Sequence, residues 1–135
     1  MQSATQSSQT SNKMLWAGRI VSALPVLLLI FSAVVKLMKP ADVVTEFARL
    51  GYPESLVVGI GVLELLCTVV YLIPRTSVLG AILLTGYLGG ATATHVRIGD
   101  VFIYPIIGGI LVWGGLYFRD ARIRALIPLR SNASE

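Results

Sequence analysis

Charged residues are scarce in this sequence: Asp, Glu, Lys and Arg together make up 13% of its 135 residues. Soluble domains carry about 25% charged residues. A domain of this size also leaves roughly a third of its chain surface exposed, too much to hide a composition that is 55% hydrophobic. With a mean hydropathy of +0.77, the scarcity of charge excludes an ordinary soluble domain and indicates a chain embedded mostly in lipid.

Cysteine and histidine are nearly absent, with Cys67 and His95 the single examples. One cysteine excludes an internal disulfide, and one histidine excludes a Cys/His metal cage within a single chain, so we predict no metal site. The signatures of α/β-hydrolases, zinc proteases, P-loop proteins and dinucleotide-binding proteins are also absent. No basic patch with interleaved aromatic residues occurs, so we expect no nucleic-acid partner. The sequence does not point to an enzyme acting on its own.

Long apolar runs, in contrast, fill more than half of the chain. They cover residues 20–35, 55–74, 76–94 and 101–118, and Glu64 is the single charge within them. A helix that crosses the hydrocarbon core needs about 20 apolar residues. Extended by their apolar neighbours, the runs predict spans at about residues 16–37, 55–73, 76–95 and 101–118. The expected fold is all-α, an integral membrane four-helix bundle.

The segments outside these spans are short and have their own patterns. Apolar residues at helical spacing between residues 39 and 55, with Pro40 and Asp42 before them and Gly51 after them, predict a short amphipathic helix that lies on the outer membrane surface or caps the bundle. Residues 1–13 are a polar tail that we expect to be disordered. One four-helix domain is expected over residues 14–130, and residues 119–135 form a basic tail.

Basic residues predict the orientation of the bundle. Four spans place both termini on one side of the membrane, and that side carries seven Lys and Arg residues against four on the other. Because cytoplasmic loops are enriched in Lys and Arg, we expect both termini and the basic tail to lie in the cytoplasm.

Glu64 is the most informative residue, because it lies about 14–15 Å from either end of the second span. A charge at this depth costs several kcal/mol unless it is paired or neutralised. Side chains lean toward the N-terminus of their helix, so Lys36 and His95, near the outer ends of the first and third spans, lean toward the depth of Glu64. We therefore predict a polar cluster in the outer half of the bundle, formed by Glu64, Lys36, His95, Arg97, Tyr87, Thr68 and Tyr71.

Two interpretations of this cluster stay open. The contacts either fix the order of the helices or handle protons or a ligand, while Lys36 and Arg97 can also reach the head groups. Whether Glu64 is ionised stays open too, since burial disfavours the charged form and a nearby cation favours it.

Glycines at helical spacing predict close contacts between helices. Small residues let neighbouring backbones approach, either within one chain or at a dimer face, and we expect packing within the chain. The candidate packing residues are Gly61, Gly86, Gly90, Gly108 and Gly109.

Several short motifs together resemble the DoxX-like family of small four-span bacterial membrane proteins. They are Trp16-Ala17-Gly18-Arg19-Ile20, Phe31-Ser32-Ala33 before Lys36, Phe47-Ala48-Arg49-Leu50-Gly51-Tyr52-Pro53, Gly59-Ile60-Gly61-Val62-Leu63-Glu64, Gly89-Gly90-Ala91, Thr94-His95-Val96-Arg97 and Tyr117-Phe118-Arg119-Asp120. Ala33 stands where the family pattern has a glycine. The resemblance implies a multi-pass protein of the bacterial cytoplasmic membrane, and the family takes its name from a subunit of a thiosulfate:quinone oxidoreductase.

Three functions follow as expectations. The first is an accessory redox-linked subunit with no cofactor of its own, whose polar pocket binds a quinone-like molecule or a lipid, or relays protons. It would need a partner redox protein to supply electrons, or would act as a homo-oligomer in the lipid bilayer. The alternatives are a non-catalytic membrane scaffold that docks a partner protein, and a pathway for a small solute or protons, which the absence of an inverted repeat disfavours.

Overall fold

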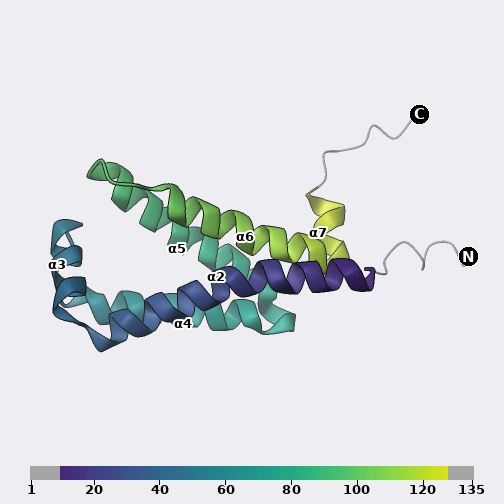
Figure 1. The fold of residues 1–135 in the computed structure, drawn as a ribbon, viewed down its shortest axis with the longest axis horizontal. Helices are drawn as coiled ribbons and strands as arrows, with labels where there is room; N and C mark the ends of the chain where they lie inside the picture. Colours follow the sequence, from purple (N-terminus) through teal and green to yellow (C-terminus); the bar gives the residue numbers. More distant parts are fainter. Residues whose placement is uncertain (1–9, 128–135) are drawn as a thin grey trace, which may run out of the picture.

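A computed structural model describes residues 10–127 of the chain, and all of its regular structure within this range is helical. This confirms the all-α fold class. The helices, labelled as in Figure 1, are α2 (Asn12–Met38), α3 (Ala41–Arg49), α4 (Leu56–Leu72), the short 3₁₀ helix η1 (Pro74–Thr76), α5 (Ser77–Arg97), α6 (Ile103–Arg119) and α7 (Ala121–Leu126).

Local sequence explains where the helices begin and end. The hydroxyl of Ser11 accepts a hydrogen bond from the backbone N–H of Met14 and caps the start of α2. Lys39 ends the same helix in the left-handed conformation, with a φ of 54°. Gly51 has a φ of 85° just after α3, where its lack of a side chain avoids strain. These turns set α3 apart from the two long helices that it connects.

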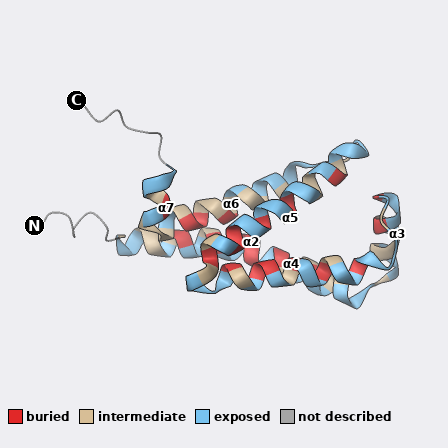
Figure 2. Cartoon of the chain, turned by 180° about the vertical axis from the view of Figure 1, so that it is seen from behind, coloured by how far each residue is buried: buried red, intermediate tan, exposed pale blue. Residues whose placement is uncertain are grey.

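The long helices form two pairs that meet at one end and spread apart at the other. Helix α2 packs against both α4 and α6, and α5 also packs against α4 and α6. In Figures 1 and 2 the α2–α4 pair and the α5–α6 pair spread toward α3. We call the end with α3 and the loop of residues 98–102 the wide end, and the opposite end the narrow end. Arg124 of α7 donates a hydrogen bond of 2.7 Å to Thr10, so the first and last described segments meet at the narrow end.

Glycines give the narrow end its tight packing. A Cβ atom on Gly80 of α5 would lie 2.2 Å from the backbone nitrogen of Tyr71 in α4. One on Gly115 of α6 would lie 2.0 Å from the hydroxyl oxygen of Ser22 in α2. These backbones approach so closely because glycine has no side chain, as in other membrane helix contacts. The buried core runs from here toward the middle of the bundle, through residues such as Leu84, Val112 and Leu116.

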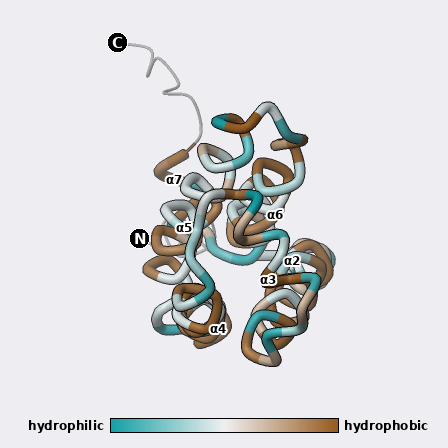
Figure 3. The backbone as a smooth tube through the Cα atoms, turned by 90° about the vertical axis from the view of Figure 1, so that its left-hand side faces the viewer, coloured by the Kyte–Doolittle hydropathy of each residue, from teal (hydrophilic) through white to brown (hydrophobic). Residues whose placement is uncertain are grey.

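Large apolar side chains cover the outside of the molecule. Exposed Leu, Ile, Val and Phe residues occur on all four long helices, as the outward faces in Figure 2 and the hydropathy colours in Figure 3 show. Two segments, Asn12–Met38 and Pro74–Arg97, are long and apolar enough to cross a membrane. Helices α4 and α6 are apolar but only 17 residues long. The number of spans therefore stays a prediction.

The segments outside the four long helices differ in part from the expectations. Helix α3 lies within the stretch expected to hold a short amphipathic helix. Helix α2 begins at Asn12, so the last two residues of the expected polar tail are helical, while residues 1–9 lie outside the described range. Helix α7 lies within the expected basic tail, of which residues 128–135 are also outside that range.

Candidate functional site

The centre of the candidate site is an ion pair between α2 and α4. Glu64 is 2% exposed, and its Oε2 atom lies 2.8 Å from the Nζ atom of Lys36. The hydroxyl of Ser32, one turn before Lys36, donates a 3.2 Å hydrogen bond to the same carboxylate oxygen and accepts one from the lysine. The ammonium group, the hydroxyl and the carboxylate are therefore all hydrogen-bonded to one another and form one polar group.

Gly61 brings the two helices close enough for this pair to form. It lies one turn before Glu64, and a Cβ atom there would be 2.9 Å from Cβ of Lys36 and 3.2 Å from the carbonyl oxygen of Ala33. Of the five glycines expected to pack helices, Gly61 makes the closest approach. Any larger residue would push α4 away from α2 and separate the carboxylate from the ammonium group.

A cavity of about 650 Å³ lies beside this ion pair, between the two helix pairs. We call it the central cavity. Ser32, Lys36 and Glu64 form the polar part of one wall, and α5 contributes Tyr87 and His95 to the other. Tyr87 lies near the Glu64 carboxylate. The rest of the wall is mostly apolar, so the cavity combines an apolar volume with one localised set of hydrogen-bonding groups, as many ligand sites do.

Thr68 and Tyr71 do not belong to this polar group, although both lie on the same face of α4 as Glu64. The hydroxyl of Thr68 donates a 2.8 Å hydrogen bond to the backbone carbonyl of Glu64, within its own helix. The hydroxyl of Tyr71 contacts Ser22 of α2 and the carbonyl oxygen of Val112 in α6. Tyr71 is two helical turns from Glu64, about 10 Å along the axis, so it joins three helices at the narrow end instead.

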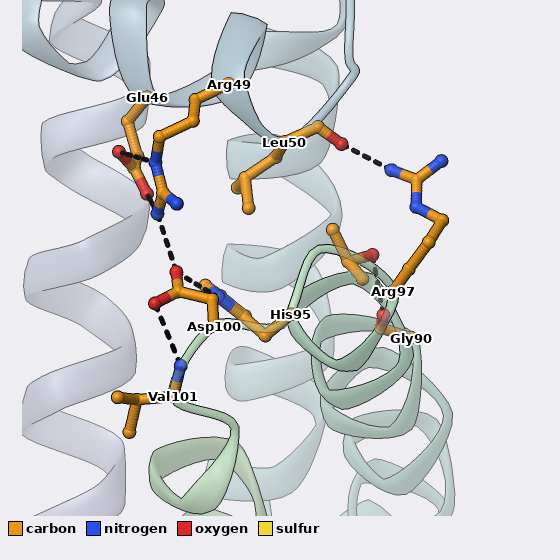
Figure 4. Close-up of polar contacts among 9 residues, drawn as sticks. Glu46, Arg49, Leu50, Gly90, His95, Arg97, Asp100 and Val101 are labelled. Carbon is orange, nitrogen blue, oxygen red and sulfur yellow. Dashed lines mark hydrogen bonds and ion pairs between the residues drawn. The ribbon is translucent and has the colours of Figure 1, made fainter.

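His95 and Arg97 are also not brought to Glu64, because each of them has another partner. Asp100, in the loop after α5, has its Oδ2 atom 3.2 Å from Nδ1 of His95 and 2.6 Å from Nη2 of Arg49 in α3. Arg49 also pairs with Glu46 on its own helix. Arg97 donates a hydrogen bond to the backbone carbonyl of Leu50 (Figure 4).

These contacts fasten α3 to the end of α5, and we call them the α3 network (Glu46, Arg49, Leu50, His95, Arg97 and Asp100). The hydrogen bond from Arg49, with smaller contributions from the Val101 N–H and from His95, holds the pKa of Asp100 at about 2. Arg49 likewise lowers the pKa of Glu46. Both carboxylates therefore stay ionised across the physiological pH range, and the network is permanently charged.

Helix α3 closes the wide end of the central cavity. Phe47 and Leu50 are buried and line the cavity, and the hydroxyl of Tyr52 lies 3.0 Å from that of Thr94 on α5. The sequence predicted an amphipathic helix that lies on the membrane surface or caps the bundle, but it did not place Arg49, Asp100 or these cavity residues at the site. The apolar face of α3 was a usable signal, because an apolar helix face needs a surface to cover.

Two of the predicted packing glycines contact no neighbouring helix within the described part of the chain. A Cβ atom on Gly86 or Gly90 would have nothing within 4 Å, and both residues line the central cavity. They make no helix contact because α5 has already diverged from α4 at this height. Gly108 and Gly109 do face α5, where a Cβ atom would lie 3.6 Å and 4.0 Å from the side chain of Leu88. These are ordinary van der Waals distances.

Comparison with known proteins assigns the family. The model of the DoxX-like family matches residues 20–115. The chain belongs to the DoxX-like family. The matched range of this DoxX-like chain includes the Lys36–Glu64 pair and the α3 network. Searches of curated proteins and of solved structures found no match. Family membership and the two long apolar helices together indicate a membrane protein.

Proposed function

We propose that the chain spans the membrane four times. Helices α2 and α5 both run from the narrow end to the wide end, so α4 and α6 must return the chain between them. Each of these two helices is about 25 Å long, close to the 30 Å of a hydrocarbon core, and its flanking residues make up the difference. The exposed apolar side chains on all four helices support the same arrangement.

The basic residues support an orientation with the narrow end in the cytoplasm. Arg19, Arg75, Arg119, Arg122 and Arg124 all lie on segments at this end. The wide end, with α3 and its acidic partners, then faces the outside. By the rule that cytoplasmic segments are enriched in basic residues, both termini are cytoplasmic, as in a bacterial inner-membrane protein.

We further propose that the central cavity binds a quinone-like molecule and that the chain is an accessory redox-linked subunit. The observation that carries this proposal is the position of the Lys36–Glu64 pair in the wall of an otherwise apolar cavity of about 650 Å³. A pair that served only to order the helices would need no open volume beside it. A ring carbonyl can accept a hydrogen bond from the Lys36 ammonium group or the Tyr87 hydroxyl.

The chemistry of this chain is limited to binding and proton handling. Reducing a quinone requires two electrons and two protons. Lys36, Glu64 and Tyr87 can hold or pass protons at the head group, while the electrons must come from a partner redox protein. The same residues would serve a proton relay, but the buried α3 residues at the wide end close the direct route from the cavity to water.

Binding of decylubiquinone to the purified full chain in lipid nanodiscs tests the proposal. Glu64→Gln keeps the shape of the side chain and removes the charge that holds the Lys36 ammonium group in position, so we expect about tenfold weaker binding, about the value of the charged hydrogen bond that the displaced lysine would otherwise donate to the ligand. Tyr87→Phe removes a single hydroxyl and tests whether the opposite wall of the cavity contributes to binding. Glu54→Gln, which removes an exposed carboxylate from a surface pair with Lys39, is the matched control and should bind normally.

Two binding results are needed to support the quinone site. Saturable binding by the unaltered chain must be weakened by Glu64→Gln and not by Glu54→Gln. Absence of saturable binding, or equal affinity of all variants, would show that the cavity is not a quinone site. Thermal unfolding of each variant, recorded in parallel, separates a lost contact from a lost fold.

A further inference from the structure

Helix α3 covers the wide end of the central cavity. Phe47 and Leu50 of α3 cover this end with buried apolar side chains. The α3 network and the contact between Tyr52 and Thr94 hold α3 against α5. A water-soluble ligand arriving from the outside would have to displace a whole helix and break several charged contacts.

The side between α4 and α5 is open. At the narrow end the two helices touch, with Gly80 directly against the backbone of Tyr71. Further along α5, Gly86 and Gly90 have free space beside their backbones and still line the cavity. The helices therefore form a wedge whose open part leads into the cavity.

Exposed apolar side chains frame this opening. Leu63 of α4 is 51% exposed, and Ile82 and Leu83 of α5 are 55% and 41% exposed, although all three line the cavity. Leu63 is next to Glu64, near the middle of α4, so in a membrane the opening faces the hydrocarbon core. We call Leu63, Ile82, Leu83 and Gly86 the lateral opening.

We infer that the ligand of the central cavity enters from the bilayer through the lateral opening, and that it is a single-tailed amphiphile. This inference rests on the proposed function, in which the chain spans the membrane and the cavity holds a ligand. The polar head lies against Lys36, Glu64 and Tyr87. The tail leaves between α4 and α5 into the acyl chains, because its apolar surface stays in an apolar environment along the whole path.

Photolabelling in vesicles tests the route without requiring that the ligand be a quinone. The full chain is reconstituted in phosphatidylcholine vesicles that contain a fatty acid with a diazirine on its alkyl chain. After illumination, labelled residues are identified by mass spectrometry. Cys67 is buried and lines the cavity, so label on it reports a tail inside the cavity.

A matched pair of glycine variants makes the test specific. Gly86→Leu places a side chain in the lateral opening, where nothing lies within 4 Å of its Cβ atom. Gly89→Leu makes the same change three residues later, also in open space, but on a face of α5 that does not line the central cavity. We expect Cys67 to be labelled in the unaltered chain and in Gly89→Leu, and to lose the label in Gly86→Leu.

The outcomes separate this inference from the proposed function. Label confined to outward-facing residues, or cavity labelling unchanged by Gly86→Leu, would overturn the lateral route, whatever the result of quinone binding. Loss of the label in Gly86→Leu supports the route. If decylubiquinone then fails to compete with the label in the unaltered chain, the route stands and the quinone head group is wrong.

Discussion

Removing Lys36 should destabilise the protein far more than removing an equally basic residue from its surface. In Lys36→Met the Glu64 carboxylate, 2% exposed, keeps only the hydrogen bond from Ser32. Breaking a buried ion pair by removing one partner costs about 3–5 kcal/mol. Lys36 itself is 16% exposed, so we expect the lower end of this range, about 3 kcal/mol.

A double-variant cycle shows whether this cost comes from the unpaired charge. Glu64→Leu in the Lys36→Met background removes that charge, and well-packed apolar replacements of buried pairs are often neutral or stabilising. We therefore expect the double variant to recover most of the lost free energy of unfolding. The control is Lys39→Met, which breaks the exposed pair with Glu54 and should cost less than about 1 kcal/mol.

The assay is the free energy of unfolding in detergent micelles, measured for the unaltered chain and the three variants under identical conditions. Two results would refute the reasoning. One is a double variant as unstable as Lys36→Met, which would mean that the lost packing of the lysine stem, rather than the orphaned carboxylate, causes the damage. The other is a cost for Lys36→Met no larger than that for Lys39→Met.

Two further predictions concern the two ends of the bundle. Gly80→Ala should lower the free energy of unfolding by about 1–3 kcal/mol, because the new methyl group meets the backbone of α4, whereas Gly89→Ala, in open space, should not destabilise the chain. Asp100→Asn should weaken the contact with Arg49, seen as faster amide hydrogen exchange in α3. Because the pKa of Asp100 falls from 3.8 to about 2, this contact is present above about pH 4 and lost as the pH falls toward 2. The distance between spin labels on α3 and on the loop of residues 98–102 should therefore stay constant from about pH 7 to 4 and lengthen only in stronger acid.

Sequence reasoning succeeded where a single helix carries the information. Apolar runs and their charged borders predicted the all-helical fold, because hydrophobicity over a helix length is a local property. The depth of Glu64 and the direction in which helical side chains lean placed Lys36 opposite it, and the structure has these two residues in contact. That prediction needed only the order of antiparallel helices.

Sequence reasoning failed where the contact partner of a residue depends on a loop or on the angle between helices. His95 lies on the expected helix, but the loop after α5 turns Asp100 back toward it. Asp100 therefore replaces Glu64 as the carboxylate that pairs with His95. Gly86 and Gly90 have the same spacing as glycines at true helix contacts. Whether such a pair meets a neighbour or a cavity is decided by the divergence of α5 from α4, which no local pattern records.

The size of the central cavity has an energetic consequence for any ligand. At about 650 Å³ the central cavity is too large to stay empty without loss of the van der Waals contacts that its wall would otherwise make. An apolar wall does not hold water well enough to fill it. Because the lateral opening leads to the hydrocarbon core, we expect an acyl chain to occupy the cavity when no ligand is bound. Exchange of that chain for the tail of an amphiphile is then nearly neutral in free energy, since both are apolar. Affinity and selectivity would therefore come from the head group at Lys36, Glu64 and Tyr87, so lengthening the tail of a ligand should improve binding far less than restoring one polar contact there.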